Sequence, residues 1–218
     1  MLSYTEENYL KAIYRLSEGG SKAVTTNEIA EVMSTKAASV TDMVKKLSGK
    51  ELISYEPYYG AKITKSGKTE ALMVIRKHRL WETFLVNKLN FNWDEVHDVA
   101  EQLEHIHSAL LIEKLDEFLG HPTADPHGHP IPDKHGKVQQ VRQVPLAEAF
   151  QGKKAIVRSV TDSSPSYLQY LSKIGVYIGA SVTVLEKIEF DGSLEILIDN
   201  KKKVFISRDA ALNLLVTE

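Results

Sequence analysis

The chain has 218 residues, of which 43% are hydrophobic, so it can form one to three small domains with a real core. It contains no cysteine, which excludes disulfides, thiolate zinc sites and cysteine nucleophiles and fits a reducing cytoplasm. The formal net charge of −2 conceals an uneven distribution of charge along the sequence. Lysines are concentrated in residues 36–68, whereas acidic residues and all eight histidines are concentrated in residues 73–135. The charge of the first segment favours binding of a polyanion, and that of the second favours binding of cations.

The chain shows no sign of a membrane segment. No apolar run approaches the roughly 18–20 residues that would cross a bilayer. The first residues lack a basic start followed by a long apolar stretch, so no signal peptide is predicted. We therefore expect a cytoplasmic protein without a membrane partner.

Residues 4–17 carry apolar side chains at helical spacing, after a helix-start signal at Thr5. We expect this apolar stripe to lie in a core. Glu7, Asn8 and Lys11 point away from the stripe on the predicted helix, so they can reach a neighbouring element.

The next segment predicts a winged helix-turn-helix. Residues 25–33 and 37–53 give two amphipathic helices joined by a tight turn. Residues 52–64 predict a hairpin that turns at Tyr59–Gly60, as a wing would. An ordinary α+β domain with solvated lysines is the alternative. In the DNA-binding interpretation, small polar side chains approach base edges and lysines approach phosphates. The expected DNA-binding residues are Thr26, Thr35, Lys36, Ala38, Ser39, Thr41, Asp42, Lys45, Lys46, Tyr59 and Lys62.

Three further helices are predicted after the hairpin. The apolar positions of residues 66–89 nearly encircle the helix, so it needs partners on more than one side. Residues 94–106 and 108–119 supply two more apolar stripes. The surplus apolar surface suggests a two-fold homodimer.

Imidazoles and carboxylates recur at helical spacing on the first two of these helices. The residues are His78 and Glu82 on one helix and His97, Glu101, Glu104 and His105 on the other. If the helices pack face to face, charges gather in a small volume, where burying them unpaired is costly. A divalent cation removes that cost. A set rich in oxygen and free of sulfur favours Mn²⁺ or Fe²⁺ over zinc.

Residues 120–145 are rich in proline, glycine and histidine and predict a loop or linker. Within it, Asp125, His127 and His129 are either metal ligands or solvated side chains. From residue 144 short strands dominate, interrupted by a helix at 164–175, and their number suggests a small barrel.

The chain as a whole resembles the diphtheria-toxin-repressor family of metal-dependent transcription regulators. The resemblance rests on the helix-turn-helix, on RKHRLWE at residues 76–82, on VHDVAEQLEH at 96–105 and on the β-rich tail. It is similar to the manganese-transport-regulator branch, in the long form with an SH3-like third domain. The histidine and glutamate run is specific, whereas a winged helix alone is not.

The resemblance implies an α+β fold with a winged helix-turn-helix at 1–70, a helical dimerisation and metal-binding domain at 71–125, a linker at 126–144 and an SH3-like (FeoA-like) small β-barrel at 145–218. It implies a regulator rather than an enzyme, without a small organic substrate. This regulator would bind a double-stranded DNA operator as a homodimer and repress metal-uptake genes. Metal binding would fix the orientation of the two winged helices.

The resemblance also implies two metal sites. The primary site would use Asn8, Glu101, Glu104 and His105. The second would use His78, Glu82 and His97, with contributions from Asp125, His127 and Asp162. Glu101 stands where the iron-sensing branch has cysteine, which favours Mn²⁺ with Fe²⁺ as the alternative. Asn8 replaces an aspartate or methionine, and Lys11 replaces the glutamate of the short manganese regulators.

Two other interpretations remain open at this point. A metal-dependent hydrolase would use the same side chains to hold a metal-bound water, and it would show turnover. A DNA-binding regulator with purely structural histidines would not respond to a metal titration.

Overall fold

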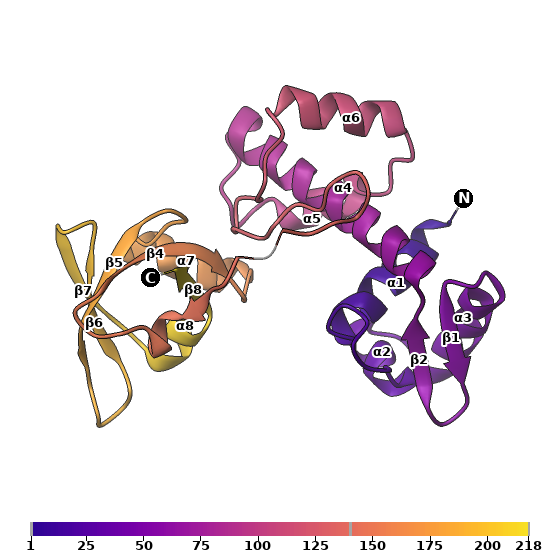
Figure 1. Ribbon diagram of the computed structural model, residues 1–218, viewed down its shortest axis with the longest axis horizontal. Helices are drawn as coiled ribbons and strands as arrows, with labels where there is room; N and C mark the ends of the chain where they lie inside the picture. Colours follow the sequence, from indigo (N-terminus) through magenta and orange to yellow (C-terminus); the bar gives the residue numbers. More distant parts are fainter. Residues whose placement is uncertain (1, 140, 218) are drawn as a thin grey trace. The chain divides into compact units, whose positions relative to one another are not determined.

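Helices occupy the first half of the chain and strands dominate the second, as Figure 1 shows. The computed structural model describes residues 2–139 and 141–217. The elements of the first half are α1 (Tyr4–Leu16), α2 (Thr26–Val32), α3 (Ala37–Gly49), β1 (Ile53–Glu56), β2 (Gly60–Ile63), α4 (Lys65–Leu89), α5 (His97–Leu103) and α6 (Ala109–Phe118). Those that follow are β3 (Val144–Pro145), the 3₁₀ turn η1 (Leu146–Glu148), β4 (Lys154–Val160), α7 (Pro165–Ile174), β5 (Ser181–Lys187), β6 (Leu194–Ile198), β7 (Lys202–Ile206), α8 (Arg208–Leu212) and β8 (Leu214–Thr217). This confirms the expected mixture of helices and strands. None of the described helices is long and apolar enough to cross a bilayer.

The chain folds as two units. The first comprises Met1–His78, Glu101–Ile112 and Pro132–Val138, and the second comprises Arg79–Ala100, Glu113–Ile131 and Gln139–Glu218. Helix α4 begins in the first unit and ends in the second. The domain boundaries predicted near residues 70, 125 and 144 stay predictions.

The first two helices begin with the same reciprocal cap. The Ser3 hydroxyl accepts the amide of Glu6, and the Glu6 carboxylate accepts the amide of Ser3. Thr25 and Glu28 repeat this arrangement at α2. The start signal predicted at Thr5 was therefore misplaced, because the capping box begins at Ser3.

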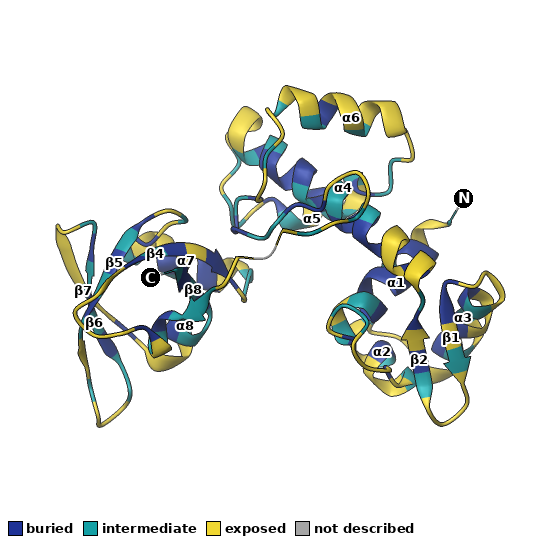
Figure 2. Cartoon of the chain, in the orientation of Figure 1, coloured by how far each residue is buried: buried dark blue, intermediate teal, exposed yellow. Residues whose placement is uncertain are grey.

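The winged helix is confirmed in the first unit. Leu10 and Ile13 of α1 are fully buried in a core shared with α2 and α3, which Figure 2 shows in dark blue. The wing is the antiparallel pair β1–β2, in which Ile53 lies opposite Ile63. A bridge from Val24 extends this pair, so the wing is anchored to the segment that precedes α2.

Helix α5 is shorter than the helix predicted for residues 94–106. It ends at Leu103, and Glu104 and His105 lie in the turn that follows. The expectation that both lie on the helix with Glu101 was wrong, because the fully buried Glu104 is fixed by side chains far along the chain rather than by helical neighbours. By contrast, α6 lies close to its predicted position and is largely exposed.

The second unit contains a six-stranded antiparallel sheet in the order β3-β8-β4-β5-β6-β7. β3 and β7 are its end strands and do not pair with each other in the described residues, so the expected closed barrel is corrected to an open, curved sheet. The register shifts between Val157 and Ser159 and between Val184 and Glu186. Such bulges bend the strands but do not by themselves close the sheet into a barrel.

A helix, rather than further strand pairing, covers the core of this sheet. Leu168 and Leu171 of α7 are fully buried among its inward side chains. Pro165 begins α7, and Gly175 ends it with a φ of 87°, which favours glycine. Helix α8 and strand β8 were not predicted, although β8 pairs with both β3 and β4.

Candidate metal centre

Helix α1 presents a polar face beside its core stripe. Glu7 and Lys11 lie four residues apart, and Asn8 lies three before Lys11, so all three occupy neighbouring positions on the helix surface. Glu7 and Lys11 are only 5% and 6% exposed. Charged side chains buried to this degree need partners.

Glu104 provides the central partner in the first unit. Its Oε2 lies 2.6 Å from Nδ1 of His78, and its Oε1 accepts a hydrogen bond from Nζ of Lys11 at 2.5 Å. The same Nζ lies 2.6 Å from Oε1 of Glu101. Burial raises the pKa of the Glu104 carboxyl, but His78 and Lys11 lower it more, so the pKa lies below its usual value. An ionised carboxylate is therefore kept in a buried position.

Glu7 orients the imidazole of His105. Its Oε2 lies 2.5 Å from Nδ1 of His105. The other ring nitrogen, Nε2, lies 3.5 Å from Oε1 of Glu104. A carboxylate that holds one ring nitrogen of a histidine fixes the tautomer and directs the other nitrogen at a ligand.

Two buried polar atoms of predicted primary-site residues have no hydrogen-bond partner among the described residues. They are Nε2 of His105 and Oδ1 of Asn8. Leaving such atoms unsatisfied is costly, so each calls for an explanation. One imidazole nitrogen, one amide oxygen and two carboxylates form a donor set that suits a Mn²⁺ or Fe²⁺ ion. The predicted primary-site residues thus fit a metal.

The second unit contains another such group around Glu82. Oε1 of Glu82 lies 3.7 Å from Nδ1 of His97, and its Oε2 lies 3.6 Å from Nδ1 of His127. Nε2 of His127 donates to the carbonyl of Trp93 at 2.7 Å, which leaves Nδ1 facing the carboxylate. Burial lowers the pKa of His127, but Glu82, Asp125 and the Trp93 carbonyl raise it more.

Asp125 organises the loop that carries His127. Its Oδ1 accepts the backbone amides of His127 and His129, and its Oδ2 lies 3.5 Å from Nε of Arg79 and 3.2 Å from Nδ1 of His129. Nε2 of His129 lies 2.8 Å from the carbonyl oxygen of Val160 on β4. The side chain of Asp125 therefore fixes the backbone of this loop at His127 and His129, and the linker predicted for residues 126–144 stays a prediction.

Gly128 explains how closely this loop approaches β4. Its φ is +83°, and a Cβ atom there would lie 1.8 Å from the carbonyl oxygen of Arg158. Only glycine fits this approach. The loop thereby connects the Glu82 group to the C-terminal sheet within the second unit.

Asp162 lies apart from the Glu82 carboxylate contacts described above. It lines a pocket of about 420 Å³ together with His97, Asp98 and residues 163–165. Its Oδ1 accepts the amide of Ser164. Acidic side chains from α5 and from the segment after β4 share this pocket.

The ten predicted metal residues thus fall into sets. The first unit contains Asn8, His78, Glu101, Glu104 and His105, and the second contains Glu82, His97, Asp125, His127 and Asp162. Nδ1 of His78 contacts Glu104, and the assignment of His78 to a site with Glu82 and His97 stays a prediction. Glu7 was not among the predicted site residues. Its spacing of four from Lys11 was a signal, but near the start of a helix a glutamate also has an ordinary explanation.

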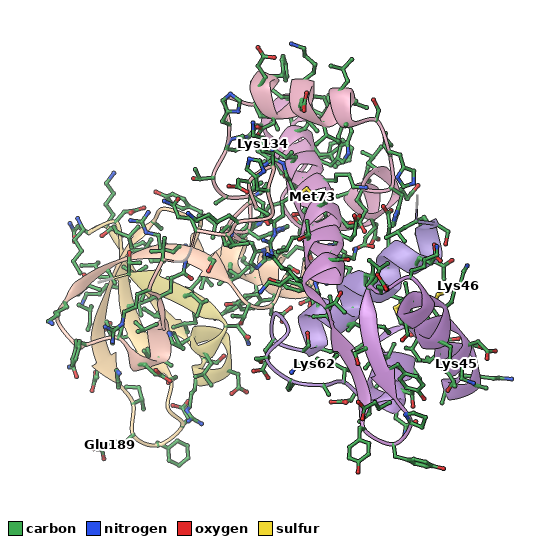
Figure 3. All side chains as sticks on the ribbon, turned by 45° about the vertical axis from the view of Figure 1, so that its right-hand side comes forward. Lys45, Lys46, Lys62, Met73, Lys134 and Glu189 are labelled. Atoms are coloured by element: carbon green, nitrogen blue, oxygen red, sulfur yellow. The ribbon has the colours of Figure 1, made fainter. Side chains whose placement is uncertain are left out.

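The predicted DNA-binding residues come from α2, α3, the turn that joins them and the wing. Thr26 and Thr41 are half-buried, and the other nine are exposed. Figure 3 labels Lys45 and Lys46 on α3 and Lys62 on β2. Lys46 also pairs with the buried Glu6 at 3.2 Å, so only part of its charge faces outward.

Three family models match the chain. The iron-dependent repressor N-terminal DNA-binding domain matches residues 1–61, the iron-dependent repressor metal-binding and dimerisation domain matches 64–133, and the FeoA domain matches 144–218.

Among curated proteins, an HTH-type transcriptional regulator of Methanocaldococcus jannaschii is 33% identical over 118 residues, which cover 54% of this chain and 94% of that protein. The iron-dependent repressor IdeR of Mycobacterium leprae is 28% identical over 219 residues, covering 95% of this chain and 94% of its own.

Solved structures give the same family over nearly the whole length. A manganese-dependent transcriptional repressor in complex with manganese is 35% identical, covers 98% of this chain and 99% of its own, and has a TM-score of 0.86. The manganese regulator SloR is 34% identical, covers 98% of each chain and has a TM-score of 0.73. The chain therefore belongs to the iron-dependent repressor family, to which the diphtheria toxin repressor also belongs, and is a metal-dependent, DNA-binding transcriptional regulator.

Proposed function

We propose that this chain is activated by Mn²⁺, with Fe²⁺ as the alternative, to bind an operator as a homodimer and repress metal-uptake genes. The observation that carries the proposal is a pair of buried, unsatisfied atoms on predicted ligands: Oδ1 of Asn8, and Nε2 of His105, which lies 3.5 Å from Oε1 of Glu104. These atoms are ligands of the kind that a divalent cation satisfies.

The first site would be held by Asn8, Glu101, Glu104 and His105. A divalent cation would supply positive charge shared by two carboxylates and two neutral donors. Glu7 holds the His105 ring in the required orientation. Asn8 lies on α1, which packs in the core of the winged helix, whereas the other three ligands belong to the segment after α4. Occupancy of the site would therefore tie α1 to that segment.

The choice of Mn²⁺ over zinc rests on ligand chemistry. The first site offers carboxylate and amide oxygens and one imidazole, with no thiolate, and oxygen-rich sets suit Mn²⁺. The solved relatives described above are manganese regulators, whereas IdeR is an iron-dependent repressor. We propose that Glu82, His97, Asp125 and His127 form a second site, with Asp162 close to His97.

Homodimer formation is supported by α6. Leu110, Leu111 and Phe118 on this helix are 66%, 40% and 61% exposed. Exposed leucine and phenylalanine on one helix mark a surface that associates with a partner. In a two-fold dimer the two α3 helices would enter successive major-groove half-sites, with Ser39 and Asp42 near base edges and Lys45 near phosphates.

A direct test uses an operator selected from random double-stranded DNA in the presence of MnCl₂. Fluorescence anisotropy then measures its affinity for the wild type, for His105→Ala and for His121→Ala, with MnCl₂ or with EDTA. His121 is an exposed histidine paired with Asp116, so its variant is a matched control. We expect His105→Ala to lose about tenfold or more of the Mn²⁺-dependent affinity, which corresponds to about 1.4 kcal/mol. Equal Mn²⁺ dependence in all three proteins would refute the proposal.

A further inference from the structure

We propose that Asp42 on α3 selects the operator sequence, by accepting a hydrogen bond from the amino group of one cytosine in each half-site. This inference rests on the proposed function, because it presumes that α3 of each protomer enters the major groove of an operator. It adds the base that the chain recognises and the side chain that recognises it.

The position of Asp42 on α3 is the first argument. Val40, Val44 and Leu47 are fully buried and define the face of α3 that packs in the core. Ser39 and Asp42 are exposed and lie three residues apart in the first half of the helix, so they are neighbours on its outer surface. In a helix-turn-helix, the N-terminal residues of the second helix contact base edges. Asp42 is therefore placed to meet a base.

The second argument is that Asp42 has no other partner. Oγ1 of Thr41 donates to the carbonyl oxygen of the residue four positions earlier, at 2.9 Å, and Nζ of Lys46 pairs with the buried Glu6 at 3.2 Å. The carboxylate of Asp42, by contrast, has no hydrogen bond or ion pair with any residue that the structure describes. Residues 16–75 contain no arginine, the side chain that recognises guanine most often. The carboxylate is thus available to DNA in a helix that lacks the usual guanine reader.

The chemistry of a carboxylate restricts the base that it can contact, because both of its oxygens are acceptors. In the major groove, guanine presents the acceptors N7 and O6, and thymine presents the acceptor O4 and a methyl group. Only cytosine, through N4, and adenine, through N6, offer an amino group there. Adenine also presents the acceptor N7 beside its amino group, and this lone pair repels the carboxylate. Cytosine is therefore the base that suits Asp42.

The charge of Asp42 makes this selection sharper. DNA is a polyanion, so a carboxylate on the helix that enters its groove is repelled at every sequence. Against guanine or thymine the carboxylate is also desolvated without a hydrogen-bond donor, which adds a further cost. The exposed Lys36 and Lys45, which precede and follow Asp42, supply attraction to phosphates, and Figure 3 labels Lys45. Asp42 therefore acts against the wrong bases as well as for the right one.

The test begins with a selection of operators from random double-stranded DNA in the presence of MnCl₂. The full-length wild type, Asp42→Asn, Asp42→Ala and Glu31→Gln are each used, and the selected DNA is sequenced. Glu31→Gln is the matched control, because it also removes one negative charge from an exposed position of the winged helix, on α2. Circular dichroism melting checks that each variant folds. Asp42→Asn, which has nearly the shape of the wild type, decides the matter if Asp42→Ala does not fold.

A second measurement identifies the base that is contacted, because a C·G pair also places a guanine in the groove. Fluorescence anisotropy measures the affinity for the selected operator with 2′-deoxyzebularine in place of the cytosine, which removes the N4 amino group. In another operator, 7-deazaguanine replaces the opposite guanine, which removes its N7 acceptor.

We expect the wild type to select one cytosine in each half-site at a position where the Asp42 variants differ from it. Another base or 2′-deoxyzebularine at this position should weaken wild-type binding about tenfold or more. Asp42→Asn should select adenine there, because an amide accepts from N6 and donates to N7 of adenine. Asp42→Ala should bind the unmodified and 2′-deoxyzebularine operators equally, and 7-deazaguanine should change the affinity of the wild type and of Asp42→Ala by the same factor. Glu31→Gln should select the wild-type sequence.

Each contrary outcome has a distinct meaning. A wild type that selects no common sequence with MnCl₂ overturns the proposed function and this inference with it. A selected operator with the same base preferences in the wild type and in both Asp42 variants overturns the inference and leaves the proposed function standing. The same holds if the wild type selects a base other than cytosine at the position that depends on Asp42. It holds also if loss of the N4 amino group weakens the wild type and Asp42→Ala equally, because Asp42 would then not be the acceptor.

Discussion

Glu6 offers a quantitative test of the winged helix. It is 1% exposed, its Oε1 lies 2.6 Å from Nζ of Lys50 and 3.2 Å from Nζ of Lys46, and its Oε2 accepts the amide of Ser3. Burial raises the pKa of this carboxyl, but the two lysines and the Ser3 amide together bring it from 4.5 to about 2. Replacing Glu6 by glutamine removes the charge while keeping a side chain that can complete the capping box.

The magnitude follows from proton linkage. A difference of about 2.5 pKa units corresponds to about 3.4 kcal/mol at neutral pH. Lys50 and Lys46 are 39% and 56% exposed, so solvent screens their charge, and we expect Glu6→Gln to lower the unfolding free energy by about 1–2 kcal/mol. Because the pKa is lowered on folding, this contribution is complete above about pH 5 and is lost as the pH falls from 4.5 towards 2.

The assay is urea unfolding followed by far-ultraviolet circular dichroism at about pH 7 and about pH 3, where more than half of the contribution is gone. Glu28→Gln is the control, because Glu28 occupies the same capping position at α2 but is exposed. We expect the difference between wild type and Glu6→Gln to shrink at the lower pH. A difference that is the same at both pH values would refute the reasoning.

Three further predictions concern other parts of the chain. Gly128→Ala should destabilise the second unit by about 2 kcal/mol or more in thermal melting. Gly152→Ala is the control and should destabilise it less, because Gly152 has a similar φ but nothing lies within 4 Å of a Cβ added there. Equal effects of the two substitutions would contradict the close approach of the loop to β4. Lys45→Ala should weaken operator binding for all sequences and reduce the slope of log affinity against log salt by about one, and an unchanged slope would exclude a phosphate contact. Leu110→Asp should raise the dissociation constant of the dimer in sedimentation equilibrium, and an unaltered constant would place the interface away from α6.

Most helices of the first 120 residues could be located, though not their exact ends, because their signals are local. Apolar spacing places Leu10 and Ile13 on one face, and short-range caps such as Thr25 with Glu28 mark where a helix begins. The wing could be predicted for the same reason, because its turn residues and alternation lie within a few positions.

The partners within the candidate site could not be predicted in this way. Lys11 and Glu104 are 93 residues apart, and no local pattern indicates that one neutralises the other. The end of α5 at Leu103 depends on the same long-range contacts. A residue's spacing fixes the face of a helix that it occupies, but not the side chain that it meets there.

The C-terminal sheet was predicted in part for a related reason. Alternating burial along β6, with Leu194, Ile196 and Ile198 inward, follows directly from the strand pattern. Closure of the sheet depends on register shifts and on which strands form its ends, and α7 covers the core instead. These are properties of pairing between distant segments.

Helix α1 has a consequence for how a signal passes through the regulator. Glu6 in the first turn of α1 forms ion pairs with Lys46, in the last turn of α3, and with Lys50, the residue that follows this helix. The adjoining positions carry Asn8, a proposed metal ligand, and Lys11, whose ammonium pairs with Glu101. Because a continuous helix without a kink-forming residue moves as one piece, a small rotation of α1 caused by metal binding at the proposed site would be passed to α3 with no flexible joint to absorb it.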